Sequence, residues 1–351
     1  MLIGEAGPRV DNRVLIPTHG KVPIRPPSDL IWDFAGQTMG TTWAVRLVPP
    51  PGLDRAAFQA AIEDELGRII LLFSHWEPRS ELSRLNAAPP GFWAVSEPFW
   101  AFLNAALDLA DDTDGAVDPT LGALVDLWGF GPPGPRPADS FGKGGLTVPL
   151  EEEIAAARKL SGWGRLRLNR AARGVQQLGG VRLDFSGIAK GHAVDKVSER
   201  LAAMGATCHL VEIGGELRGS GVKPDGRPWW VELQQAPGAP APRTVAALFD
   251  MAAATSGDWV RRFEGYGQIY SHTIDGRTGR PVDNGVASVT VLADTAMYAD
   301  AMATALTVMG PGGGPAFAAD MKIAAAFVIR GPDGLTEIVT PAFTAMLEEG
   351  A

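Results

Sequence analysis

Residues 183–191, with the sequence LDFSGIAKG, hold side chains of the kind that bind phosphate groups. A predicted strand ends here and a predicted helix begins, with Lys190 in the first helical turn. Free N–H groups and the positive end of a helix dipole, together with a lysine ammonium, suit an anionic phosphate. The G-x-x-x-x-G-K-[ST] spacing of a Walker loop is absent, so a purely structural turn is the alternative. Asp184 either caps the helix or accepts hydrogen bonds from a ligand.

Asp300 and Thr304 stand four residues apart in a second predicted helix. This spacing stacks their side chains on one helix face. A carboxylate and a hydroxyl in line supply two oxygen ligands to a hard cation such as Mg²⁺. The alternative is that Asp300 faces solvent and that Thr304 is a tolerated polar residue of an apolar helix.

His272 lies in the turn-rich segment 270–279, YSHTIDGRTG, beside hydroxyl groups and a carboxylate. Histidine is the side chain best suited to move protons near neutral pH. The residues alone leave two interpretations open, a catalytic group and a structural hydrogen bonder. The other four histidines have no comparable neighbours in the sequence; they are His19, His75, His192 and His209.

Two further side chains could form platforms for an aromatic ligand. Met39 stands in the turn-prone segment 36–41, and Trp76 follows the end of a predicted helix. Both residue types are also common fillers of a hydrophobic core. The chain has no H-E-x-x-H motif, no G-x-S-x-G elbow and no Ser-His-Asp order, which excludes several hydrolase classes.

The composition excludes other classes of protein. The 351 residues include 31 Lys and Arg against 40 Asp and Glu, a formal net charge of −9, which argues against a nucleic-acid binder. The single cysteine, Cys208, excludes an intramolecular disulfide and a Cys-rich zinc site. There is no transmembrane segment by length, and the N-terminal stretch lacks both a signal-peptide apolar run and a lipid-attachment cysteine. We therefore expect a cytoplasmic location for the chain as written.

Hydrophobic periodicity and turn residues predict the elements that must position these side chains. Helices are expected at 55–73, 97–112, 151–160, 187–204 and 296–309, the last ended by Gly310-Pro311. Strands are expected at 43–49, 181–185, 208–213, 229–234, 286–292, 323–329 and 336–339. The strands at 208–213 and 229–234 are expected to pair as a hairpin, and hairpins mixed with clustered helices favour an α+β fold. Residues 1–30 are expected to form an irregular arm, residues 31–345 one domain, and residues 129–145 a lid or a variable insertion.

Taken in this order, the segments resemble the ApbE family of FAD:protein FMN transferases from about residue 34 to 339. The matching stretches are 38–41 (TMGT), 80–86 (SELSRLN), 117–120 (VDPT), 184–191 (DFSGIAKG) with Asp195, 214–215 (GG), 255–258 (TSGD), 271–275 (SHTID), and Asp300 with Thr304. Three positions depart from the family pattern. Trp76 stands where tyrosine is frequent, Gly276 where proline is common, and Glu216 where Asn or Asp is common.

The resemblance implies a fold, a substrate and a set of site residues. It implies an ApbE-like α+β fold of antiparallel or mixed sheets, FAD as substrate and Mg²⁺ as cofactor. The residues that would contact FAD are Met39, Trp76, Ala116, Val117, Asp118, Asp184, Lys190 and His272. The side chains of Asp300 and Thr304 and the backbone carbonyl of Ala189 would hold the metal.

The implied reaction is transfer of FMN from FAD to a Thr or Ser hydroxyl of an acceptor flavoprotein, with release of AMP. His272 would remove the hydroxyl proton, and Lys190 would stabilise charge on the phosphates. Two alternatives use the same site: an FAD pyrophosphatase with water as nucleophile, and a non-catalytic FAD carrier. Many relatives are exported lipoproteins, so the sequence does not name the acceptor.

Overall fold

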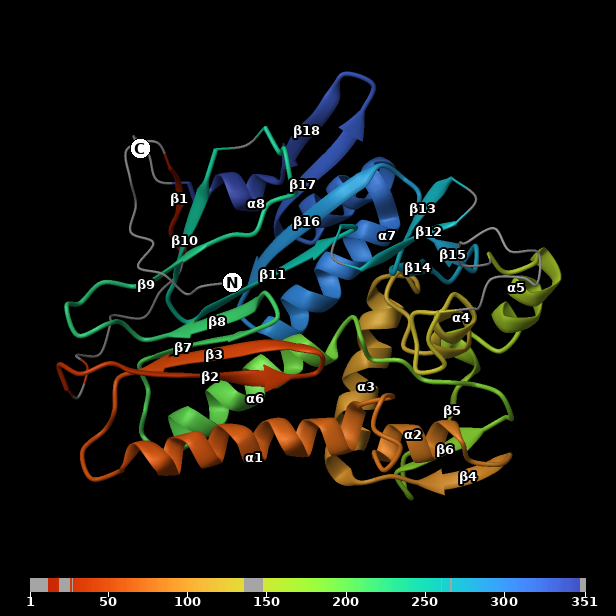
Figure 1. Cartoon of the computed structure of the whole chain (residues 1–351), viewed down its shortest axis with the longest axis horizontal. Helices are drawn as coiled ribbons and strands as arrows, with labels where there is room; N and C mark the ends of the chain where they lie inside the picture. Colours follow the sequence, from red (N-terminus) through yellow and green to blue (C-terminus); the bar gives the residue numbers. More distant parts are fainter. Residues whose placement is uncertain are drawn as a thin grey trace.

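An eight-stranded antiparallel sheet forms the centre of the molecule (Figure 1). The computed structural model describes residues 12–18, 26, 28–135, 148–240, 242–259, 261–265 and 267–347. Across the sheet the strands are β18 (Gly334–Val339), β17 (Ala324–Gly331), β16 (Val286–Ala293), β11 (Met251–Gly257), β8 (Glu216–Ser220), β7 (His209–Ile213), β3 (Thr41–Leu47) and β2 (Trp32–Thr38). The sheet is thus assembled from strands of both chain halves.

Three long helices cover one face of this sheet (Figure 1). They are α1 (Arg55–Phe73), α6 (Ala189–Ala203) and α7 (Ala296–Asp320). α7 packs on β16 and β11, α6 packs against both α7 and α1, and α3 (Glu97–Asp112) stands beside them. The main hydrophobic core lies between the helices and the sheet.

Smaller elements surround this frame. Two small sheets consist of β1 (Arg13–Leu15), β10 (Thr244–Leu248) and β9 (Trp229–Glu232), and of β4 (Gly91–Ala94), β6 (Gly174–Gln177) and β5 (Arg167–Asn169). Two hairpins are β12 (Arg262–Gly265) with β13 (Gln268–Ser271), and β14 (Ile274–Asp275) with β15 (Arg280–Pro281). The short helices are α2 (Glu81–Asn86), α4 (Gly122–Leu127), α5 (Glu151–Arg158) and α8 (Pro341–Thr344).

The expected α+β class is confirmed, and most expected helices begin where local chemistry places them. Asp54, Ser96 and Thr295 each accept a hydrogen bond from a backbone N–H in the first turn of the following helix. Such caps satisfy donors that a helix start otherwise leaves unpaired. Three residues of the expected irregular arm form β1, which pairs with β10 in parallel. Most of the proposed lid at 129–145, namely residues 136–145, lies outside the described residues.

The strand expected at 181–185 is wrong, because other groups take its backbone hydrogen bonds. The Asn86 side chain bonds both the N–H and the carbonyl of Leu183. The Asp184 N–H donates to the carbonyl of Pro119, at 2.9 Å. Only one isolated bridge, between Leu121 and Arg182, forms in this segment. The segment is extended but has no ladder partner.

Two other expectations need correction. β7 pairs with β3 and β8, whereas β9 belongs to the separate sheet with β10, so the expected hairpin of the two segments is wrong. The expected helix end at Gly310 is a kink: Gly310 has φ 72° and ψ −177°, and helical structure resumes to Asp320. The left-handed φ suits glycine, and proline next to it fits the first turn of a new helical run.

α6 and α7 approach each other closely enough that only glycine fits at the contact. A Cβ at Gly191 would stand 2.2 Å from the carbonyl oxygen of Ala296 and 2.8 Å from the Cβ of Asp300. The carboxylate of Asp195 on α6 accepts hydrogen bonds from the N–H groups of Ala296 and Met297, at 3.0 and 2.9 Å. One helix therefore caps the other.

No helix in the described part of the chain combines the length and the apolar character needed to cross a bilayer.

We predict that Gly191→Ala destabilises the protein by about 1–3 kcal/mol or more, since the added methyl group meets backbone that cannot rotate away. The control is Gly67→Ala on α1, where an added Cβ meets nothing within 4 Å. That change is expected to be neutral or to stabilise by up to about 1 kcal/mol through helix propensity. Chemical denaturation measures both; equal stability of Gly191→Ala and the wild type would refute the close contact.

Candidate functional site

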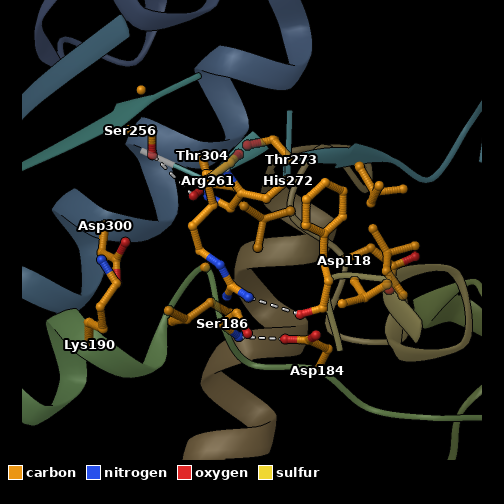
Figure 2. Close-up of a pocket in the computed structure, with 18 of the residues that line it drawn as sticks. Asp118, Asp184, Ser186, Lys190, Ser256, Arg261, His272, Thr273, Asp300 and Thr304 are labelled. Carbon is orange, nitrogen blue, oxygen red and sulfur yellow. Dashed lines mark hydrogen bonds between the residues drawn. The ribbon is translucent and has the colours of Figure 1, made fainter. Parts of the chain in front are cut away.

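A cavity of about 210 Å³ opens where α6 begins, against the flank of α7 and the loops around Asp118 and His272 (Figure 2). Its polar lining comes from segments far apart in the sequence. These residues are Asp118, Asp184, Ser186, Lys190, Glu216, Gln234, Thr255, Ser256, Arg261, His272, Thr273, Asp300 and Thr304. Because α6 and α7 are in close contact at Gly191, side chains from both helices line the same cavity.

The cavity gathers eight of the residues that the sequence analysis proposed: Ala116, Val117, Asp118, Asp184, Lys190, His272, Asp300 and Thr304. It does not gather the remaining three. Met39 lies in the β2–β3 turn and packs against the main core. Trp76 is 52% exposed, and its ring stands 5.6 Å from that of His75. Ala189 does not line the cavity, although its neighbours Ile188 and Lys190 do.

Asp300 and Thr304 occupy one face of α7 directed at the start of α6 (Figure 2). One carboxylate oxygen of Asp300, Oδ2, accepts a hydrogen bond from the Gly191 N–H at 3.0 Å. The Thr304 hydroxyl lies 3.4 Å from that of Ser256, at the end of β11. A Cβ at Gly187 would come within 3.2 Å of the same hydroxyl, so the turn before α6 passes close by.

This oxygen pair fits a hard cation such as Mg²⁺. Asp300 is buried, and only one of its carboxylate oxygens is used by the Gly191 N–H. Mg²⁺ is commonly held by one or two carboxylates, with water and phosphate oxygens completing the shell. Among the described residues no group of three or more His, Cys, Asp and Glu side chains could hold a metal, so a zinc-type cluster does not compete here.

Lys190 is held in a buried ion pair. Its ammonium group bonds Oε1 of Glu216, which is 2% exposed, and Oε2 of Glu216 has no hydrogen-bond partner among the described residues. Burial would lower the pKa of Lys190, but Glu216, Asp300 and Glu212 together raise that pKa above its ordinary value. Burial also raises the pKa of Glu216 and of Asp300, against the effect of Lys190. Lys190 therefore stays protonated as the counter-ion of these carboxylates.

One ring nitrogen of His272, Nε2, has no hydrogen-bond partner in the part of the chain that the structure describes. The carbonyl of Arg261 lies 3.1 Å from the backbone nitrogen of His272 and 3.1 Å from its Nδ1. A carbonyl only accepts hydrogen bonds, which assigns the proton to Nδ1 and leaves the Nε2 lone pair available. Burial lowers the pKa of His272 to about 4. The imidazole is therefore neutral at pH 7, the state that a general base requires.

Two aspartates hold the loops that close the cavity. Asp118 Oδ1 accepts hydrogen bonds from the N–H and the hydroxyl of Thr120, at 2.8 and 2.6 Å, and burial raises the pKa of Asp118. Asp184 Oδ1 accepts from the Ser186 N–H at 2.7 Å, and its Oδ2 lies 3.6 Å from Nδ1 of His75. Asp184 thus stabilises the turn before α6 and lines the cavity, but it does not cap the helix, because α6 begins after Ile188 without a side-chain cap.

The sequence analysis assigned no site role to Glu216, Ser256 or Arg261, which all line the cavity. Ser256 lies within the family-like stretch 255–258 and Glu216 directly follows the stretch 214–215, so these stretches could have indicated a site role for both residues. Arg261 belongs to no motif. Only the fold brings it to the cavity, by placing it directly before β12.

A buried carboxylate beside a hydroxyl, a fixed ammonium group and a neutral histidine in one cavity are typical of enzymes that act on phosphate-containing substrates. The comparisons define the family. The model of the ApbE family matches residues 39–327, and the chain belongs to that family. The expected family, and with it an enzyme that transfers flavin, is confirmed.

Curated relatives agree over most of their length. The chain is 37% identical to the FAD:protein FMN transferase of Vibrio cholerae over 325 residues, which cover 90% of this chain and 92% of the relative. It is 33% identical to that of Haemophilus influenzae over 90% of this chain and 91% of the relative. Among solved structures, the apo form of Pseudomonas stutzeri flavinyl transferase ApbE aligns with a TM-score of 0.82 and 36% identity, covering 92% of this chain and 98% of that one.

The Lys190–Glu216 pair leads to a stability prediction. Lys190→Met is expected to cost somewhat less than the roughly 3–5 kcal/mol seen when one partner of a fully buried pair is removed, because part of the lysine is exposed. In this variant the pKa of the buried Glu216 carboxyl lies above its value in the unfolded chain, because burial raises this pKa and Lys190 no longer lowers it. The contribution of Glu216 to stability is then fully present below its unfolded-state pKa and is lost as the pH rises through its folded-state pKa.

Lys196→Met is the matched control, since both lysine side chains are 33% exposed but the partner of Lys196, Glu199, is 56% exposed. A surface pair is worth only about 0–1 kcal/mol. The double variant Lys190→Met/Glu216→Gln should recover stability relative to Lys190→Met at pH 8. Urea denaturation at pH 5 and pH 8 provides the comparison, and a Lys190→Met loss no larger than that of Lys196→Met would contradict the buried pair.

Proposed function

We propose that this chain transfers the FMN part of FAD to a Thr or Ser hydroxyl of an acceptor flavoprotein and releases AMP, in a Mg²⁺-dependent reaction. The observation that carries the proposal is the shared cavity of His272, Asp300 and Thr304 in a member of the ApbE family. The names of the relatives in Vibrio cholerae and Haemophilus influenzae support FAD as donor and a protein as acceptor.

In this proposal the side chains of Asp300 and Thr304 would hold the metal, and the backbone carbonyl of Ala189, whose neighbours Ile188 and Lys190 line the cavity, would be a third ligand. Mg²⁺ neutralises charge on phosphate oxygens when it is bound. Ser256 supports Thr304 from β11, and the Gly191 N–H fixes the Asp300 carboxylate. The residues of α6, α7 and β11 therefore orient the ligands before any substrate arrives.

His272 acts as the general base. Its Nε2 accepts the proton of the acceptor hydroxyl, and the hydroxyl oxygen forms a bond to the phosphorus of the FMN half. The phosphoanhydride bond breaks at the same time, and AMP leaves with the bonding electrons. The hydrogen bond from Nδ1 to the Arg261 carbonyl holds the ring in the tautomer that this step needs, and the backbone N–H bond to the same carbonyl holds the His272 backbone in place. Lys190 keeps the carboxylates beside the metal ligands charge-balanced.

Replacement of His272 tests the base. His272→Ala should lower the transfer rate by about 10²–10⁴-fold while the Kd for FAD changes only a few-fold. Because the pKa of His272 is lowered to about 4, the wild-type rate should rise with pH around this pKa and stay level from pH 6 to 8. The assay follows the mass of an acceptor protein after incubation with FAD and Mg²⁺. Transfer at the wild-type rate by His272→Ala across that pH range would remove the assignment.

Replacement of the metal ligands tests the cation site. Thr304→Val and Asp300→Asn should each raise the Mg²⁺ concentration for half-maximal transfer by at least about tenfold, the lower end of the effect of groups that only support metal ligands. Thr307→Val is the control, because Thr307 lies on the same helix and its hydroxyl bonds the Ala303 carbonyl. An unchanged Mg²⁺ titration in Thr304→Val and Asp300→Asn would place the metal elsewhere. Free FMN without an adduct would favour hydrolysis over transfer.

A further inference from the structure

The cavity has more negative than positive side chains. Four carboxylates line it, Asp118, Asp184, Glu216 and Asp300, against the two cationic side chains Lys190 and Arg261. Lys190 is already committed, because Glu216 binds its ammonium group directly. An anionic phosphate entering the cavity would therefore find little free positive charge on the α6 side.

Arg261 is the cation that is not committed. Among the described residues Arg261 forms no ion pair, and its side chain extends across the cavity (Figure 2). One terminal nitrogen donates a hydrogen bond to the backbone carbonyl of Phe130, at 3.2 Å. A guanidinium group has five N–H donors, so this single bond restrains the side chain while most donors stay available.

The same residue also positions the general base. The backbone carbonyl of Arg261 accepts both hydrogen bonds of His272, and its side chain lines the cavity beside that histidine. If the guanidinium binds a phosphate, the same residue contacts the substrate through its side chain and holds His272 through its backbone carbonyl. Arg261 would therefore set the position of the phosphate relative to the general base.

We infer that Arg261 is the phosphate-binding cation of this site and that it binds the diphosphate of FAD, whereas Lys190 serves as counter-ion to Glu216 and Asp300. This inference rests on the proposed function, because FAD supplies the diphosphate. A planar guanidinium binds two phosphate oxygens at once, and the tether to Phe130 lowers the ordering cost. Arginine is therefore the better choice than lysine at this position.

The test compares a phosphorylated flavin with an unphosphorylated one. In the presence of Mg²⁺, Arg261→Ala should raise the Kd for FAD by about tenfold to hundredfold, as expected for charge-assisted hydrogen bonds, and leave the Kd for riboflavin unchanged. Arg261→Gln, which keeps an N–H donor for the Phe130 carbonyl, should show the same selective loss. Arg261→Lys should recover part of the FAD affinity. Quenching of flavin fluorescence measures each Kd.

Arg262→Ala is the matched control. Arg262 is the next residue, is exposed on β12 and does not line the cavity, so both Kd values should stay at the wild-type level. Wild-type FAD affinity in Arg261→Ala, or equal losses for FAD and riboflavin, would overturn the inference while the proposed function stands. A wild-type protein that does not bind FAD would overturn the proposed function and this inference with it.

Discussion

The contact between α6 and α7 is the constraint on which the site depends. Gly191 allows the two backbones to meet, and the Asp195 carboxylate accepts hydrogen bonds from the first N–H groups of α7. The Arg218 guanidinium also donates a hydrogen bond to Oδ1 of Asp195. Asp300 then lies against the Gly191 N–H, one turn from Thr304. A wider spacing of these helices would separate the side-chain oxygens of Asp300 and Thr304 from the helical turn that carries Lys190. The contacts that pack the two helices therefore also position the side chains of the site.

Charge explains why this site suits a cation and an anion together. An excess of carboxylates in a partly enclosed cavity repels a diphosphate, and a divalent cation reverses that repulsion. Lys190 offsets the charge nearest the α6 start, while the Arg261 side chain, which comes from the segment before β12, adds a second positive charge to the cavity lining. Neutral His272 adds no charge of its own, because burial lowers its pKa to about 4. On the proposed function, a divalent cation and a diphosphate would therefore bind this cavity together.

Local chemistry made much of the fold and the site predictable. Caps such as Asp54 and Ser96 and the four-residue spacing of Asp300 and Thr304 act within a few residues, so the sequence reveals them. Contacts between distant segments were not predictable from the sequence. The Asn86 side chain takes the backbone hydrogen bonds of Leu183 in the strand expected at 181–185, and β7 pairs with β8 instead of β9. Arg261 carries no local signal, because its role arises from the hairpin that brings it to the cavity.

The most direct test of the account is to locate the metal in crystals of the protein grown with Mn²⁺ and FAD, by anomalous diffraction. We expect one strong peak within coordination distance of the Asp300 carboxylate and the Thr304 hydroxyl, with a phosphate oxygen of the nucleotide completing the contact. A peak that contacts neither side chain, while the nucleotide occupies the cavity, would contradict the central claim.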